Sequence, residues 1–166
     1  MMDLANDVVQ LLESQNWKLV LAESCTCGRV AAELGLVPGV SQWLCGSWVV
    51  YRASSKEHWL GIPADFLEHY STESLECSRE LAVAALERTP EATVVAGITG
   101  DLGPGAPEEK DGRVYVVVGK RVEGATPRWT QRELKLVNTD RAARQLEATR
   151  SLLRLLLEWL EDEAAR

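Results

Sequence analysis

A short apolar run, residues 19–22, ends abruptly at a carboxylate followed by Ser24 and Cys25, and a helix-like stretch covers residues 27–35. This pattern predicts a buried strand that turns directly into a helix. A side chain in such a turn stands above the edge of the sheet, and the first N–H groups of the helix point toward it. Ser24 is therefore the candidate nucleophile, because it gains exposure and stabilisation of developing negative charge. The alternative is that Ser24 or Thr26 only caps the helix.

A second group of candidate residues is Tyr51 and Lys56. The sequence around Lys56 has the form of a capping box, with Ser54 as the N-cap and Glu57 three residues later. Lys56 would then lie in the first turn, where the helix dipole disfavours a cation, and a neutral lysine is a base able to activate a serine hydroxyl. Tyr51, ending the preceding strand, could direct its phenol to the same place. The alternatives are a solvated surface lysine and an amphipathic rim tyrosine.

A glycine-rich segment, residues 97–105, is the third feature. It follows a predicted buried strand, at the edge where open α/β sheets bind ligands, and glycines let backbone amides approach an anion. It has neither the Gly-Lys-Ser/Thr of a Walker loop nor the helix start of a dinucleotide-binding fingerprint. The alternative is an ordinary surface loop.

The remaining pattern concerns the elements that position these residues. Predicted strands and helices alternate, which indicates the α/β class with helices on both faces of one sheet, as three layers. No repeat or linker interrupts the chain, so residues 1–166 are expected to form one domain. Helices are predicted over 3–15, 27–35, from 54, after 63, over 73–88 and from 140 to about 161, and strands over 18–22, 43–51, 93–98, 114–118 and 128–137.

Composition excludes several classes of protein. The 166 residues are 46% apolar and 26% charged, which is typical of a globular domain. A net charge of −7 without a basic block argues against nucleic-acid binding, although one small anionic ligand remains compatible. No apolar stretch is long enough to span a membrane, and the acidic N-terminal pattern is unlike a secretory signal, so a cytoplasmic location is expected.

The cysteines and histidines do not have the spacing of a metal site. A single Cys-x-Cys, formed by Cys25 and Cys27, has no matching second pair, so no metal is expected. Nothing indicates an oxidising compartment, and all four cysteines are expected to be reduced.

Six segments occur along the chain in an order that resembles the CinA C-terminal domain family, which includes the nicotinamide mononucleotide deamidases (PncC). The resemblance runs from about residue 3 to residue 160. Larger CinA proteins have an additional N-terminal domain, so this chain is expected to be a stand-alone form. The segments are Ala22-Glu23-Ser24-Cys25-Thr26-x-Gly28, Val37-Pro38-Gly39-x-Ser41-x-Trp43, Tyr51-x-x-x-x-Lys56, Leu60-Gly61-Ile62-Pro63, Thr99-Gly100-x-x-Gly103-Pro104 and Gly112-x-Val114.

The resemblance implies both a fold and a reaction. The fold is a three-layer α/β/α sandwich with one mixed, mostly parallel sheet, in a homodimer; Trp129 and Trp159 are the candidates for a partner surface. The reaction is hydrolysis of the carboxamide of nicotinamide mononucleotide, a small pyridine nucleotide, to nicotinic acid mononucleotide and ammonia. Ser24 would be the nucleophile, Lys56 the base and Tyr51 an assisting group, with neither metal nor cofactor.

Two further groups of residues are expected to contact the substrate. The turn after the nucleophile would hold the oxyanion, and it contributes Cys25, Thr26 and Gly28. The glycine-rich loop would hold the phosphate or ribose, and it contributes Thr99, Gly100 and Gly103.

Three residues depart from the usual family pattern. Cys27 replaces a glycine, and it would obstruct the turn if that position needs a positive φ or close approach of the substrate. Ala53 removes a polar side chain beside the lysine, and Asp101 puts negative charge where an anion would bind. These departures leave an alternative open, which is a degenerate, non-catalytic protein that binds nucleotides or a partner on the same scaffold.

Overall fold

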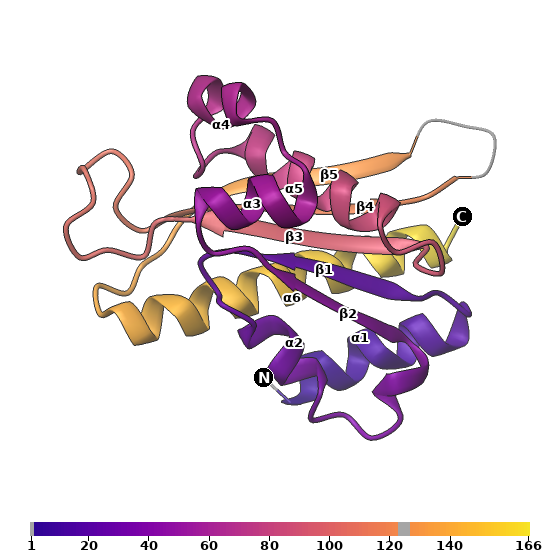
Figure 1. Ribbon diagram of the computed structural model, residues 1–166. Coiled ribbons are helices and arrows are strands. Elements are labelled where there is room, and N and C mark those ends of the chain that lie inside the picture. Colours follow the sequence, from indigo (N-terminus) through magenta and orange to yellow (C-terminus); the bar gives the residue numbers. More distant parts are fainter. Residues whose placement is uncertain (1, 123–126) are drawn as a thin grey trace.

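The computed structural model describes residues 2–122 and 127–166. These residues form an α/β domain in which helices lie on both sides of a twisted sheet (Figure 1). The strands are β1 (Leu19–Glu23), β2 (Leu44–Val49), β3 (Val94–Gly100), β4 (Arg113–Lys120) and β5 (Arg128–Lys135). The helices are α1 (Met2–Ser14), α2 (Arg29–Leu34), α3 (Ala53–Leu60), α4 (Ala64–Tyr70), α5 (Leu75–Glu87) and α6 (Arg141–Ala164), with a short 3₁₀ turn at Val40–Gln42.

The sheet is mixed, with the strand order β2-β1-β3-β4-β5. The interior strand β1 pairs in parallel with β2 and β3, whereas β4 pairs antiparallel with β3 and β5. Only β4 therefore runs against the other strands, which confirms the expected mixed, mostly parallel sheet. At the C-terminal end of β1, Glu23 pairs with Val49 of β2 and Ile98 of β3, so the residues after these strands meet at one edge.

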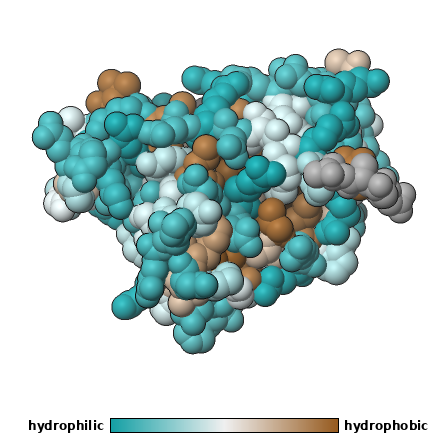
Figure 2. All heavy atoms as spheres, turned by 90° about the horizontal axis from the view of Figure 1, so that it is seen from above, coloured by the Kyte–Doolittle hydropathy of each residue, from teal (hydrophilic) through white to brown (hydrophobic). Residues whose placement is uncertain are grey.

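Two apolar cores, one on each face of the sheet, confirm the three-layer arrangement. Leu19 and Leu21 of β1 belong to the core beneath α1, α2 and α6, and Val20 and Ala22 belong to the core beneath α3 and α5. This division follows from the alternation of side chains along a strand. Seen from the side of α3 and α4, the surface is mainly hydrophilic with separate apolar patches (Figure 2). No helix in the described ranges is both long and apolar enough to cross a membrane.

The two tryptophans considered for a partner surface both pack against other residues of the same chain. Trp159 is buried in the core between the sheet and α6. The Trp129 ring packs on Gly119, and the guanidinium of Arg79 lies 5.4 Å from its centroid.

Several predicted boundaries were wrong in ways that affect the site. Helix α3 begins at Ala53 with Arg52 as its N-cap, because the Ser55 hydroxyl accepts from the Arg52 amide (3.1 Å) and donates to its carbonyl (2.8 Å). Ser54 therefore lies inside the helix, and Lys56 is its fourth residue rather than its second. The β2 strand ends at Val49, which leaves Tyr51 in the connecting loop.

Two other helices, in contrast to α3, begin later than predicted. Helix α2 begins at Arg29, since Cys27 and Gly28 both have left-handed backbone conformations (φ 53° and 87°) that no α-helix accommodates. Helix α5 begins after Ser74, whose hydroxyl accepts from the Cys77 amide (3.0 Å). Glu73 is consequently outside the helix. The predicted cap of the last helix is confirmed, because Asp140 accepts from the amide of the third helical residue.

Candidate active site

Ser24 lies in a tight turn directly after β1. Its amide donates to Ile98 O (3.0 Å) and its carbonyl accepts from the Cys27 amide (3.0 Å), so the backbone on both sides of the side chain is fixed. Ser24 is only 6% exposed, yet it lines a cavity. Its hydroxyl has no hydrogen-bond partner among the described residues. A buried, unpaired hydroxyl facing a cavity is available to a ligand.

The two amides that follow Ser24 are also available. Within the described ranges, neither Cys25 N–H nor Thr26 N–H donates to a backbone oxygen, whereas the amides of Ser24 and Cys27 do; the Cys25 and Thr26 amides both point toward the Cys25 sulfur and lower the pKa of that thiol. Backbone donors that bind no oxygen, beside a nucleophile, are the elements of an oxyanion hole.

Glu23 holds this turn in place from beneath. It is fully buried, and its two carboxylate oxygens accept four hydrogen bonds: from Thr26 Oγ1 (2.8 Å), the Val30 and Ala31 amides (both 3.0 Å) and Ser47 Oγ (3.0 Å). The carboxylate therefore caps α2, joins it to β2 and occupies the Thr26 hydroxyl. Sequence reasoning missed this role, although an acidic residue just before a short helix was a local signal for it.

The substitution at Cys27 is accommodated by its exposure. The position does require a positive φ (53°), the condition under which we expected a residue other than glycine to be unfavourable. The Cys27 side chain is exposed, so it carries backbone strain without filling the turn. The following Gly28 also has a positive φ (87°), and it lies close to the Val49 side chain.

The cavity beside Ser24 has a volume of about 140 Å³. Four of the residues expected at the site line it, namely Ser24, Cys25, Tyr51 and Gly100. Asp101 also lines the cavity and brings a carboxylate to its wall. Three further lining residues were not predicted: Glu73, Leu102 and Arg141.

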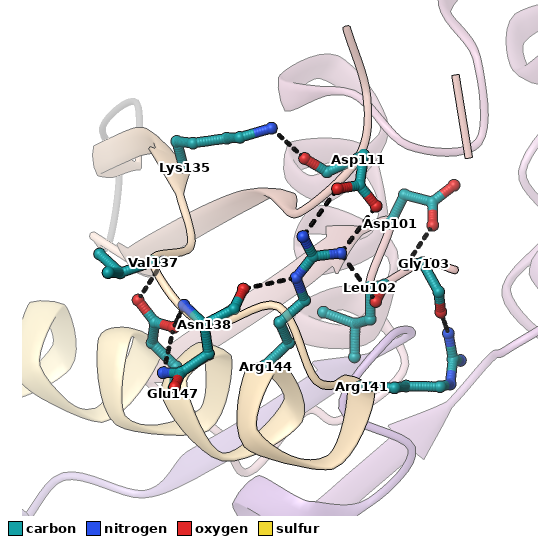
Figure 3. Close-up of polar contacts among 10 residues, drawn as sticks. All are labelled: Asp101, Leu102, Gly103, Asp111, Lys135, Val137, Asn138, Arg141, Arg144 and Glu147. Carbon is teal, nitrogen blue, oxygen red and sulfur yellow. Dashed lines mark hydrogen bonds and ion pairs between the residues drawn. The ribbon is translucent and has the colours of Figure 1, made fainter. Parts of the chain in front are cut away.

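Arg141 joins Tyr51 in the cavity wall to the glycine-rich loop. Its Nη2 donates to Tyr51 Oη (2.7 Å), and its Nη1 donates to the Gly103 carbonyl (Figure 3). Because a guanidinium only donates, the Tyr51 oxygen accepts, and the phenolic hydrogen remains free to donate to a ligand.

Lys56 lies beside the cavity rather than in its wall. The residue is 1% exposed, and its Nζ donates to Thr72 O (2.7 Å) instead of to Ser24. It forms no ion pair with any described residue. Its charge is close enough to Cys25 to lower the pKa of that thiol. To act as a base, the amine must exchange the Thr72 carbonyl for the Ser24 hydroxyl, and catalytic hydrogen bonds are often incomplete before substrate binds.

The Cys25 thiol, which follows Ser24 in the turn, is a poorer candidate nucleophile than the serine hydroxyl. Burial raises the pKa of Cys25 to about 12, against smaller opposing effects of nearby amides and of Lys56. Burial also raises the pKa of Cys77, to about 11. Because the thiolate is the reactive form, Cys25 stays protonated and unreactive at neutral pH. Ser24 is the better nucleophile in this cavity.

The structure does not bring Thr99 into the cavity. The Thr99 hydroxyl is buried, hydrogen-bonded to Ser78 Oγ (2.7 Å) and donating to Ser74 O (3.2 Å), so it joins β3 to α5. Gly103 directs its amide to Asp101 Oδ1 (2.8 Å) rather than into the cavity (Figure 3). Gly100 alone of the three loop residues lines the cavity.

An ion pair that sequence reasoning missed fixes the glycine-rich loop. Arg144 is buried and binds both oxygens of Asp111 at 2.7 Å, and it also donates to the carbonyls of Asn138 (2.7 Å) and Leu102 (3.2 Å) (Figure 3). The Arg144 hydrogen bonds lower the pKa of Asp111. A Cβ on Gly103 would lie 2.5 Å from Asp111 Oδ1, so the loop packs this closely only with glycine there.

No cluster of three or more metal-binding side chains occurs within residues 2–122 and 127–166. The four cysteines carry free thiols.

Comparison with known proteins identifies the family of this chain. The sequence profile of the CinA C-terminal domain matches residues 1–160. The chain belongs to the CinA C-terminal domain family. A CinA-like protein of Chlorobium phaeovibrioides is 31% identical over 95% of this chain, and a putative competence-damage inducible protein of Clostridium perfringens is 33% identical over 94%. The chain spans 37% and 36% of the lengths of these two relatives.

Solved CinA structures share the whole fold. The competence/damage-inducible protein CihA of Agrobacterium tumefaciens superposes with a TM-score of 0.88 at 25% identity, covering 96% of this chain and 94% of that one. A CinA superfamily protein of Klebsiella pneumoniae gives the same TM-score at 24% identity, over 97% and 98% of the two chains. The three-layer fold of this CinA domain is thus that of its family.

Proposed function

We propose that this CinA domain is an amidohydrolase that converts nicotinamide mononucleotide to nicotinic acid mononucleotide and ammonia. The observation that carries the proposal is the buried, unpaired Ser24 hydroxyl, which faces a cavity that Cys25 also lines, in a turn where neither the Cys25 amide nor the Thr26 amide binds a backbone oxygen. This combination provides a nucleophile and an oxyanion hole without a metal.

In the first step Lys56 takes the proton of Ser24, and Oγ attacks the carboxamide carbon. The amides of Cys25 and Thr26 stabilise the oxyanion, each such donor contributing roughly 10²–10³ in rate. The C–N bond then breaks, and the leaving nitrogen takes a proton from the Lys56 ammonium or through Tyr51, so that ammonia departs and an ester on Ser24 remains.

In the second step water hydrolyses this ester. Lys56, neutral again, accepts a proton from the water, and the hydroxide attacks the ester carbonyl in the same oxyanion hole. Ser24 regains its proton from Lys56, and the carboxylic acid product gives its own proton to solvent, where ammonia takes it up, so that the product departs as a carboxylate. Each proton taken up is thus returned within the cycle.

The size of the cavity limits which part of the substrate enters it. A volume of about 140 Å³ is smaller than the 300–1,000 Å³ of most ligand sites, so it takes the ring with its carboxamide and excludes the ribose phosphate. A second, wider hollow of about 370 Å³ shares Tyr51 with the first, and Arg52 and Ser54 line it. We place the phosphate there, beside the Arg52 guanidinium, rather than on the glycine-rich loop, where Asp101 would repel it.

The direct test is a product assay with three amides: nicotinamide mononucleotide, nicotinamide riboside and nicotinamide. We expect ammonia and nicotinic acid mononucleotide in equal amounts from the nucleotide, and slower release from the other two. The proposal would be rejected if none of the three amides released ammonia under conditions in which an active deamidase of the same family releases it.

One observation favours the alternative of a nucleotide-binding protein without turnover. Lys56 donates to Thr72 O, so the base is not yet paired with its nucleophile. This alternative predicts that nicotinamide mononucleotide raises the melting temperature while no ammonia is released. Turnover of the nucleotide would exclude it.

A further inference from the structure

Two carboxylates in the wall of the Ser24 cavity have no cation in direct contact. Glu73 and Asp101 both line the cavity, and neither forms an ion pair with any described residue. The nearby basic side chains bind neutral oxygens instead: Lys56 donates to Thr72 O (2.7 Å), Lys110 to Ser71 Oγ (3.0 Å) and Arg141 to Tyr51 Oη (2.7 Å).

Neutral hydroxyls hold the Glu73 carboxylate. Thr72 Oγ1 donates to one of its oxygens (2.5 Å), and Ser71 Oγ lies 3.5 Å from the other. Ser71 has a positive φ (72°) and ends α4, and Ser74 caps α5, so Glu73 lies on a short connection fixed at both ends. This arrangement positions the charge without neutralising it.

Asp101 is positioned in a similar way. One of its oxygens accepts from the Gly103 amide (2.8 Å), and the other makes no hydrogen bond to a described residue (Figure 3). The unpaired hydroxyl of the buried Ser24 lies in the wall of the same cavity. A ligand that reaches Ser24 therefore enters a space with one arginine and two carboxylates that no cation contacts directly, since the charge of Arg144 acts on Asp101 only from a distance.

We propose that Glu73, together with Asp101, makes this site selective for carboxamides carried on a positively charged group, such as a pyridinium ring, over neutral amides. The inference rests on the proposed function, because it takes the Ser24 cavity as the amide site. A cationic ring in the cavity restores the charge balance of its wall.

The same charges favour release of the product. Hydrolysis replaces a neutral carboxamide with a carboxylate in the same cavity, where Glu73 and Asp101 repel it. The attraction to the ring acts before the reaction, and the repulsion of the new carboxylate acts after it.

The test compares two nucleotides of the same shape. Nicotinamide mononucleotide has a charged pyridinium ring, and benzamide riboside 5′-phosphate has a neutral benzene ring in its place. Dissociation constants are measured by calorimetry in full-length Ser24→Ala protein, in which no turnover interferes. We expect the charged ligand to bind about tenfold more tightly, a difference of about 1.4 kcal/mol, and the preference to weaken as salt concentration rises.

Glu73→Gln, made in the same Ser24→Ala protein, keeps the shape and the oxygen that accepts from Thr72. We expect it to reduce the preference to about twofold or less. Glu76→Gln is the matched control, since this exposed glutamate in the first turn of α5 does not line the cavity. The control should keep the full preference, and unchanged melting temperatures verify that both variants fold.

The inference is overturned if neither nucleotide binds, if the neutral one binds as tightly as the charged one, or if Glu73→Gln retains the full preference. Its failure is distinguishable from failure of the proposed function. A charge preference without ammonia release by the wild-type protein rejects the hydrolase alone, and ammonia release without a charge preference rejects the inference alone.

Discussion

Replacing Glu23 with glutamine tests how the turn that carries Ser24 is held. The Glu23 carboxylate accepts two hydroxyl and two backbone hydrogen bonds, with one backbone N–H, from Val30 or Ala31, on each oxygen. A glutamine side chain presents one oxygen and one NH₂ group, and an NH₂ group cannot accept. One of these two amides therefore loses its acceptor inside the protein.

The expected cost follows from these contacts. A buried donor left without a partner costs about 1–3 kcal/mol, and loss of the negative charge at the start of α2 adds about 0.3–1 kcal/mol. We therefore expect Glu23→Gln to lower the free energy of unfolding by about 1.5–4 kcal/mol. The amidase activity should fall as well, because the turn positions both Ser24 and the oxyanion donors.

Urea denaturation, followed by circular dichroism, measures the stability change. Glu33→Gln on the same helix is the matched control, because Glu33 only pairs with Arg29 across one helical turn (3.5 Å). Such a surface pair is worth about 0.3–0.5 kcal/mol. If Glu23→Gln destabilises the protein no more than Glu33→Gln does, the carboxylate does not hold the turn and our reasoning is refuted.

Three further predictions concern other residues. Cys27→Gly should raise the free energy of unfolding by about 0.5–1 kcal/mol, because glycine adopts φ 53° without strain, and thermal denaturation that shows a loss of stability would contradict this. Since burial raises the pKa of Cys25 from 9.0 to about 12, the unfolded chain ionises first, and stability that is fully present below pH 9 is lost as the pH rises toward 12. Cys25→Ala should reduce this loss by about 1.5–2 kcal/mol between pH 9 and 10.5, as urea titrations at each pH will show, and an unchanged slope would argue against a buried thiol. Arg52→Gln should raise KM for nicotinamide mononucleotide about tenfold and leave KM for nicotinamide riboside unchanged, and an equal rise for both would place the phosphate elsewhere.

The sequence was informative where local pattern determines local structure. The apolar run before Ser24 defines a central strand, and the break after it defines the turn, so the candidate nucleophile was predicted together with its setting. The start of α3 was predicted wrongly because two serines compete for the same cap. Ser55 bonds back to Arg52, and this choice moved Lys56 by two helical positions.

The parts that escaped prediction depend on contacts between distant segments. Arg141 reaches Tyr51 across 90 residues of sequence, and Arg144 reaches Asp111 across 33. Neither pairing leaves a periodic signal, because each arises only when the sheet brings the start of α6 against the loops beside the cavity. Glu73 escaped prediction for a different reason: α5 was predicted to begin at Glu73, but it begins after its cap Ser74, which leaves Glu73 in the preceding loop.

The central claim is that Ser24 attacks the amide and that Lys56 accepts its proton. Ammonia release from nicotinamide mononucleotide, measured in parallel for wild-type, Ser24→Ala, Lys56→Met and Lys18→Met proteins, tests it most directly. Lys18 is a partly exposed surface lysine, paired with Glu91, and serves as the control. The account predicts losses of at least about 10³-fold for the first two variants and none for the third. Turnover that persists in folded Ser24→Ala or Lys56→Met protein would contradict it.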